Sequence, residues 1–241
     1  VLVDDGDVVD CTRLGKGGYS VPSIVEPEYI QIRRCTADFV LLIEKGTPGL
    51  SIGQIHRTMG AIGALQSEVI FDDCKIPAEN VVGQVGEGFT IAMKTLDDGR
   101  VSLSAFCVGA AERLLIMAKD YAQQRVQFGK PIAQNQAIQW MLADMATEIY
   151  ATRMMVYNTA RKIEAGEKAI QEAAMTKLFA TEMVGRAADR ALQVHGGMGY
   201  MKELPIERFY RDVRYLRFVE GTSEIQRIII ARGILKGREV V

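Results

Sequence analysis

The sequence lacks a cluster of cysteine and histidine residues. The four cysteines are far apart and form no CxxC pair: Cys11, Cys35, Cys74 and Cys107. The two histidines are His56 and His195. A zinc site needs several such ligands at short spacing, so we expect no metal centre and reduced thiols.

Neither sign of charge is in excess. Lys and Arg number 29 against 30 Asp and Glu, for a formal charge of -1. This balance argues against nucleic acid and anionic membranes as partners. No unbroken apolar run approaches the roughly 18 residues that span a bilayer, and the acidic first residues do not form a secretory signal. We therefore expect a soluble protein that is not secreted, and the sequence does not separate a bacterial cytoplasm from a mitochondrial matrix.

Proline is scarce after the first third of the chain, where four of the six occur. Before residue 80, turn residues separate short apolar runs such as FVLLI (39–43) and EVIF (68–71), which is typical of strands. From about Glu87 the apolar residues recur every three or four positions, which is typical of helices. Predicted helices cover roughly residues 89–121, 138–163, 168–194, 205–213 and 223–235.

These patterns predict an α+β protein that is mainly α. A small β-sheet or barrel domain (1–84) precedes an antiparallel four-helix bundle (85–241). We expect the apolar stripes of the helices to form the core. Gly166 is the expected stop of the second long helix, and the alanine-rich third one allows close packing by a neighbour.

The segment EGTSEIQ at 220–226 has two interpretations. Ser223 and Gln226 fit a capping box, with Glu220 as a favourable charge near the positive end of a helix. Alternatively, Glu220 is a carboxylate on a loop before a helix, partly desolvated by the apolar residues 215–219. Such a group can act as a general base.

The segment QVHGGMGY at 193–200 also has two interpretations. Glycines after a helix commonly form a C-cap. Alternatively, Gly196 and Gly197 let backbone N–H groups approach a pyrophosphate, with Gln193 adding a polar contact. We expect His195 to be a packed or hydrogen-bonded histidine.

Two further segments carry candidate binding residues. The turn RVQFGKP at 125–131 is either a solvated loop or a site where Arg125 neutralises a phosphate and Phe128 covers a ring edge. The run DDGR at 97–100 places adjacent carboxylates and a glycine inside a helix, which lowers helix stability and calls for a packing or binding reason.

Four arginines recur at every third position near the C-terminus: Arg208, Arg211, Arg214 and Arg217. Such a stripe can bind an anion. Because Glu207, Asp212 and Glu220 are close in sequence, we favour a salt-linked surface.

In this order the segments resemble the acyl-CoA dehydrogenase family of flavoproteins. The resemblance covers roughly residues 38–236 and depends on the strings GTPGLSIG, MGAIGALQSEVIFDDCKIPAENVVG, GEGF, TLDDGR, QRVQFGKPI, QVHGGMGY and EGTSEIQR. It implies a middle β domain, a C-terminal four-helix bundle and FAD between them. It also implies a homotetramer built as a dimer of dimers.

The resemblance implies a role for each matching residue. Glu220 matches the catalytic base, and Gly221 lies beside the thioester. Asp97 and Arg100 match a helix pair that contacts the acyl-CoA. The turn at 125–128 matches one that reaches the cofactor of a neighbouring subunit. The implied FAD contacts are Arg125, Gln127, Phe128, Gln136, Gln193, Gly196, Gly197, Thr222 and Glu224.

The implied reaction converts a short- or medium-chain acyl-CoA to a trans-2-enoyl-CoA. Glu220 removes the α-proton while hydride leaves the β-carbon for flavin N5, and the electrons pass to an electron-transferring flavoprotein. Family members for branched or long chains place the base in the first bundle helix, at the position of Gly99. Glycine cannot be a base, which leaves Glu220.

The resemblance fails over the first 35 residues. The string G-x-K-x-x-I-T-N, whose backbone contacts the flavin ring in the family, does not occur, and the family's N-terminal helical domain is missing. Either the protein is divergent or shortened, or the 241 residues join the ordered parts of a longer chain, and we favour the second explanation. Two other hypotheses stay open: a flavin monooxygenase or acyl-CoA lyase on the same fold, and a non-catalytic assembly subunit. Glu220 weighs against the former, and the missing string keeps the latter open.

Overall fold

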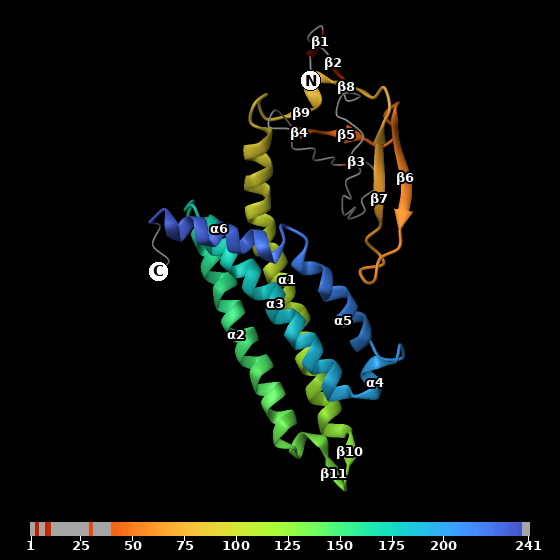
Figure 1. Cartoon of the computed structure of the whole chain (residues 1–241), viewed down its shortest axis with the longest axis vertical. Helices are drawn as coiled ribbons and strands as arrows, with labels where there is room; N and C mark the ends of the chain where they lie inside the picture. The colour runs from red at the N-terminus through yellow and green to blue at the C-terminus, as the bar shows by residue number, and fades with distance from the viewer. Residues whose placement is uncertain (1–2, 5–7, 11–28, 31–39, 238–241) are drawn as a thin grey trace. The chain divides into compact units, whose positions relative to one another are not determined.

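The computed structural model describes residues 3–4, 8–10, 29–30 and 40–237 (Figure 1). The chain divides into two compact units, Val1–Thr95 and Leu96–Val241. This boundary falls inside the first long helix, whereas the sequence placed the domain boundary after Gln84. The expected departure from the family in the first 35 residues, with Cys11 and Cys35, lies outside the described residues except for three short strands.

The strands of the first unit are short and pair in antiparallel fashion. They are β1 (Val3–Asp4), β2 (Val8–Asp10), β3 (Tyr29–Ile30), β4 (Val40–Leu41), β5 (Ile43–Glu44), β6 (Leu50–His56), β7 (Gln66–Phe71), β8 (Lys75–Pro77) and β9 (Val81–Val82). The order β1-β2-β8 forms one sheet, and β3 pairs with β5, β4 with β9, and β6 with β7. The apolar runs at 39–43 and 68–71 thus supply strands, as predicted.

A small apolar core holds the first unit together. Leu41, Ile43, Cys74 and Ile76 are buried, and Leu50, Val69, Phe71 and Val81 pack around them. The hairpin of β6 and β7 carries an irregular register between Ile52 and Ile55. The thiol of Cys74 is free, as is that of Cys107 in the second unit.

The bounds of the helices lie close to the predicted residue ranges. They are α1 (Gly88–Gln124), α2 (Gln136–Glu164), α3 (Ile170–His195), α4 (Gly197–Tyr200), α5 (Ile206–Arg214) and α6 (Ser223–Leu235), with 3₁₀ turns η2 (Ala78–Asn80), η3 (Ile132–Gln134) and η4 (Tyr215–Arg217). Between α1 and α2 lies a hairpin of β10 (Val126–Gln127) and β11 (Lys130–Pro131). The mainly helical α+β class is confirmed.

Glycines end two of the long helices. Gly166 has φ +77° and donates its N–H to Ile163 O, which confirms it as the stop of α2. Gly196 has φ +58° and donates to the carbonyls of Leu192 and Gln193, so the predicted C-cap of α3 is confirmed as well. The residues after it form the single helical turn α4 instead of the predicted glycine-rich turn.

In Figure 1, α1, α2 and α3 lie side by side and alternate in direction, α5 returns along α3, and α6 crosses near the N-terminal end of α3. The helix α3 packs against α2, α5 and α6. Ala180, Ala187, Ala188 and Ala191 on α3 are almost completely buried. Their small side chains allow the close approach that the sequence predicted.

The helix α1 is long and apolar enough to cross a bilayer, judged by length and composition alone. The core helices of soluble proteins meet the same criterion. Here Ala111, Leu114 and Ala118 of α1 belong to the apolar core that α3 also lines. The helix does not by itself indicate a membrane protein.

Replacing either of two helical glycines with alanine should change stability in opposite directions. A Cβ atom at the exposed Gly109 of α1 would meet nothing within 4 Å, so Gly109→Ala should stabilise the protein by about 0.5–1 kcal/mol. A Cβ atom at Gly233 of α6 would lie 2.6 Å from the amide of the buried Gln171. That amide donates to Ile230 O at 3.2 Å. Gly233→Ala should therefore destabilise the protein by about 1 kcal/mol.

Chemical denaturation of both variants checks this pair. Equal shifts of the same sign would show that helix propensity alone governs the two positions.

Candidate active site

The turn that carries Glu220 has an unusual backbone. It joins η4 to α6, and two successive residues, Glu220 and Gly221, have φ of +53° and +89°. A residue other than glycine rarely adopts this left-handed conformation, which costs energy unless the surroundings enforce it. The turn at Glu220 is therefore strained, and its neighbours must hold it in place.

The carboxylate of Glu220 lies over Gly99 of α1. A Cβ atom built on Gly99 would be 2.6 Å from Oε2 of Glu220 and 2.9 Å from its Cδ. Any side chain at position 99 would thus displace the carboxylate. This contact supplies the packing reason that the sequence required for a glycine inside the helix.

Arg100 holds the turn from α1. Its guanidinium is buried; Nε donates to Glu220 O at 3.4 Å, and Nη1 donates to the carboxylate of Asp97 at 2.5 Å. Burial raises the pKa of the Asp97 carboxyl, while the charge of Arg100 acts in the opposite direction. Arg100 therefore lies beside Glu220, and Asp97, the other predicted substrate residue, is hydrogen-bonded to Arg100.

Two fully buried side chains hold the turn from α3 and α6. Gln226 Nε2 donates to both Glu220 O and Gly221 O at 3.0 Å. Lys177 Nζ donates to Gly221 O at 2.7 Å and to Arg217 O at 3.5 Å. Side chains from α1, α3 and α6 thus converge on the carbonyl oxygens of one turn.

The predicted capping box at the start of α6 is wrong. The N-cap is Thr222, whose hydroxyl oxygen accepts from Ile225 N at 3.3 Å. Ser223 instead donates to Glu182 Oε1 at 2.9 Å, and Gln226 is occupied by the turn. Glu224 is exposed in the first turn of α6. A bond to its own backbone N–H and one to the Thr222 hydroxyl lower the pKa of its carboxyl.

The turn at 125–131 is the tight hairpin of β10 and β11. Phe128 and Gly129 both have positive φ, of 52° and 79°, as a two-residue type I′ turn requires. Phe128 is 98% exposed, and Arg125 and Gln127 are exposed as well. A phenylalanine presented in this way makes almost no contact within the described chain and suits a ligand or a second subunit.

The end of α3 presents an open stretch of backbone. Cβ atoms at Gly196 and Gly197 would meet nothing within 4 Å, and Gln193 is exposed. His195 behaves as predicted: it is buried, its Nδ1 lies 2.8 Å from Ala191 O, and its ring stacks on Tyr121. Burial lowers the pKa of this histidine. It is a packed residue.

The predicted site residues fall into two groups. Glu220, Gly221 and Thr222 lie near Lys177 in the N-terminal half of α3, whereas Gln193 lies at its C-terminus. Sixteen residues separate Lys177 from Gln193, which corresponds to roughly 24 Å along the helix axis. In Figure 1 the hairpin of β10 and β11 lies at the same end of the second unit as α4, far from the start of α6. Gln136, exposed at the start of α2, follows this hairpin.

Lys177 and Gln226 were not singled out as site residues in the sequence. One signal was available for Lys177, because it lies on the buried face of α3 together with Ala173, Ala180 and Val184. A lysine in an alanine-rich apolar stripe requires a polar partner. Its partner is 44 residues away in the sequence, and no local pattern reveals it.

The arginine stripe forms the predicted salt-linked surface in part. Arg211 pairs with Glu207 at 2.7 Å, Arg217 pairs with Glu182 at 2.9 Å, and Arg214 lies over the ring of Phe218. Glu182 belongs to α3, so the partner of Arg217 is distant in the sequence. Arg217 also lies against Gly185, where a Cβ atom would be 2.7 Å from its Nη2.

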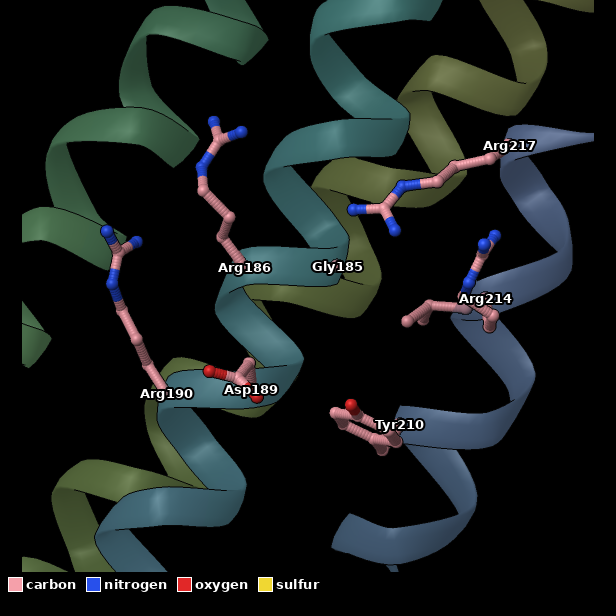
Figure 2. A pocket seen from close by; sticks show the side chains of 8 residues that line it. Gly185, Arg186, Asp189, Arg190, Tyr210, Arg214 and Arg217 are labelled. Carbon is pink, nitrogen blue, oxygen red and sulfur yellow. The ribbon is translucent and has the colours of Figure 1, made fainter. Parts of the chain in front are cut away.

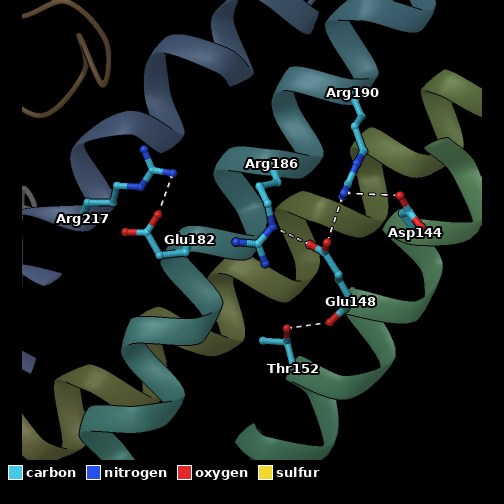
Figure 3. Close-up of polar contacts among 7 residues, drawn as sticks. All are labelled: Asp144, Glu148, Thr152, Glu182, Arg186, Arg190 and Arg217. Atoms are coloured by element: carbon cyan, nitrogen blue, oxygen red, sulfur yellow. Dashed lines mark hydrogen bonds and ion pairs between the residues drawn. The ribbon is translucent and has the colours of Figure 1, made fainter. Parts of the chain in front are cut away.

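A cleft of about 440 Å³ lies between α3 and α5 (Figure 2). It is lined by Gly185, Arg186, Asp189, Arg190, Tyr210, Val213, Arg214 and Arg217. Figure 3 shows that Arg186 and Arg190 both bond to Glu148 of α2, and that Arg190 also pairs with Asp144. Much of the positive charge around the cleft is therefore already paired. Among the described residues, no three His, Cys, Asp or Glu side chains form a metal site.

Known proteins share both the sequence and the fold. The family model for the acyl-CoA dehydrogenase C-terminal domain matches residues 86–235. An acryloyl-CoA reductase (NADH) from Anaerotignum propionicum is 46% identical over 81% of this chain and 50% of its own length. The chain thus spans about half the length of this relative.

Two solved structures are similar. Butyryl-CoA dehydrogenase from Megasphaera elsdenii has a TM-score of 0.78 and 40% identity, over 82% of this chain and 51% of that one. An acyl-CoA dehydrogenase complexed with FAD from Bacillus anthracis has a TM-score of 0.76 and 35% identity, over 83% of this chain and 38% of that one. Since the family model also covers more than half of the residues, the chain belongs to the acyl-CoA dehydrogenase family.

Proposed function

We propose that the protein is an FAD-dependent acyl-CoA dehydrogenase for short or medium straight chains, with Glu220 as the catalytic base. The observation that carries this proposal is the carboxylate of Glu220, which lies over Gly99 on a turn that three buried side chains hold. Butyryl-CoA and acryloyl-CoA, named for the similar proteins, have short acyl chains. These two names support short-chain acyl-CoA as the substrate class.

The residues of the turn have defined tasks in this reaction. Glu220 accepts the α-proton of the acyl-CoA, and its fixed position keeps the carboxylate ready for that transfer. Gly221 is proposed to lie beside the thioester. Asp97 and Arg100 are proposed to act on the substrate side of α1, where Arg100 also holds Glu220 O.

FAD is the proposed cofactor, and when bound it supplies the acceptor for the hydride of the β-carbon. The described residues fit such a group in two places. Thr222 and Glu224 adjoin the base, and the open backbone at Gly196 and Gly197 beside Gln193 leaves room for a pyrophosphate. Arg125, Gln127, Phe128 and Gln136 are the remaining proposed contacts.

The separation of these two groups supports an assembly of more than one subunit, for which we propose the homotetramer that the family resemblance implies. The exposed hairpin residue Phe128 lies far from Glu220 in the same chain, so it suits the cofactor of a neighbouring subunit. Three exposed aromatic residues of α2, Trp140, Tyr150 and Tyr157, form further apolar surface of the kind found at interfaces. We propose an electron-transferring flavoprotein as the electron acceptor and the bacterial cytoplasm or mitochondrial matrix as the compartment.

Replacement of the base tests the proposed reaction. Glu220→Gln keeps the size of the side chain but cannot accept the proton, so bleaching of the flavin should become at least about 10³-fold slower. Anaerobic addition of butyryl-CoA or octanoyl-CoA, followed by the visible spectrum, measures this rate. Flavin content should stay unchanged, and the exposed Glu203→Gln serves as the matched control.

Two outcomes would contradict the proposed function. Rapid bleaching of Glu220→Gln would place the base elsewhere. A wild-type protein that stays colourless with added FAD would favour the non-catalytic subunit.

Gly99 offers a second test of the same geometry. The added methyl group in Gly99→Ala displaces the carboxylate of Glu220, and the bleaching rate should fall about 100-fold. Stability should not fall by more than about 1 kcal/mol, because alanine favours the helix. Gly109→Ala in the same helix is the control and should bleach at the wild-type rate. An active Gly99→Ala would mean that the carboxylate does not work from this position.

Phe128 tests the proposed role of the hairpin. Because Phe128 is 98% exposed, Phe128→Ala should leave thermal unfolding of the apoprotein unchanged. Flavin retention during gel filtration should fall. Analytical ultracentrifugation reports whether the assembly persists, and full flavin content in this variant would argue against a cofactor contact.

A further inference from the structure

Lys177 is an unusual residue in the second unit. Its side chain is completely inaccessible to solvent, in the middle of the apolar face of α3. Within the part of the chain that the structure describes, it forms no ion pair with a carboxylate, and its hydrogen bonds go to two carbonyl oxygens. A buried charge without an opposite charge in contact is costly, so this lysine lowers stability unless its bonds serve another purpose.

Those two carbonyl groups stand at the two ends of the Glu220 turn. Arg217 O precedes the turn and Gly221 O follows Glu220, so one ammonium group ties the start of the turn to its end. The shorter bond, at 2.7 Å, goes to the residue directly after Glu220. Such charge-assisted bonds are roughly twice as strong as neutral ones.

We propose that Lys177 is a positioning residue, which holds the Glu220 turn in its left-handed conformation so that the carboxylate stays over Gly99. This inference rests on the proposed function of Glu220 as the base. Arg100 and Gln226 hold the same turn from α1 and α6, but Lys177 contributes the shortest bond among the three. The buried charge of Lys177 lowers the stability of the helical bundle, while its hydrogen bonds fix the position of the Glu220 carboxylate.

The surroundings of Lys177 make both effects, on stability and on the position of the carboxylate, depend on pH. Arg100 and Cys107 interact with it from α1, Glu182 from α3, Glu220 from the turn and Glu224 from α6. Burial lowers the pKa of Lys177 to about 8, from 10.5. Burial likewise raises the pKa of the Cys107 thiol to about 12, so this neighbour stays neutral.

Above pH about 8, Lys177 loses its proton in the folded protein. Between that pKa and 10.5 the unfolded chain binds more protons than the folded one, so this group makes the protein more stable as the pH rises. The charge-assisted bond to Gly221 O weakens over the same range. Stability and positioning of the base should therefore change in opposite directions.

The test compares Lys177→Met with the exposed Lys119→Met as the matched control, both in the flavin-loaded protein. Lys177→Met should bleach with butyryl-CoA about 100-fold more slowly than the wild type, at an unchanged half-saturating concentration. Its midpoint of thermal unfolding at neutral pH should be equal or higher, because an unpaired buried charge is gone. Amide hydrogen exchange in residues 216–226 should be faster, which is a readout independent of activity.

Two additional measurements test the inference if Lys177→Met does not fold. Lys177→Gln keeps N–H donors without the charge, and it should recover part of the lost rate. In the wild type, the bleaching rate should fall as pH rises past about 8 without a loss of thermal stability from this group.

The outcomes separate this inference from the proposed function. If Glu220→Gln is inactive while Lys177→Met bleaches at the wild-type rate, the inference is wrong and the proposed function stands. A lower unfolding midpoint in Lys177→Met, in proportion to its slower rate, would make Lys177 a structural residue and also overturn the inference. If Glu220→Gln bleaches as fast as the wild type, both fall together.

Discussion

Three buried hydrogen-bond donors fix the backbone of one strained turn, and the proposed reaction depends on this arrangement. Arg100, Lys177 and Gln226 come from different helices, so the position of Glu220 follows from the packing of α1, α3 and α6. A residue in the left-handed region persists only when its surroundings over-determine it. The bundle therefore serves as the scaffold of the turn.

The composition of α3 makes this convergence possible. Its alanines allow the neighbouring helices to approach closely, and the same helix carries Lys177 and Glu182 toward the segment that follows α5. Glu182 bonds to both Ser223 and Arg217, on either side of the turn. The small residues and the charged ones on α3 thus have one common effect, since both bring the Glu220 turn against the centre of the bundle.

The helices were predictable because their signals are local. Apolar periods and glycine stops gave the bounds of α2, α3 and α6 to within a few residues. The candidate base, Glu220, could also be predicted from the sequence, since a carboxylate before a helix start is a local pattern and the EGT string resembles a family motif. The partners of the turn were not predictable, because the bond of Lys177 to Gly221 joins residues 44 positions apart. The capping box at Ser223 is a wrong prediction, because Ser223 donates to the distant Glu182 and Thr222 caps the helix.

The contact between Gly99 and Glu220 also limits how the family can change its chemistry. A side chain at position 99 and the carboxylate of Glu220 would fill the same space, since even a methyl group at 99 would overlap that carboxylate. An acid added at position 99 therefore has to displace the carboxylate of Glu220, the proposed base. The new side chain and the loss of the old one are coupled substitutions whose effects do not add. With Glu220 as the proposed base, an intermediate with both side chains is crowded and one with neither lacks the carboxylate, so a transfer of the base from the turn to α1 has to pass through an unfavourable sequence.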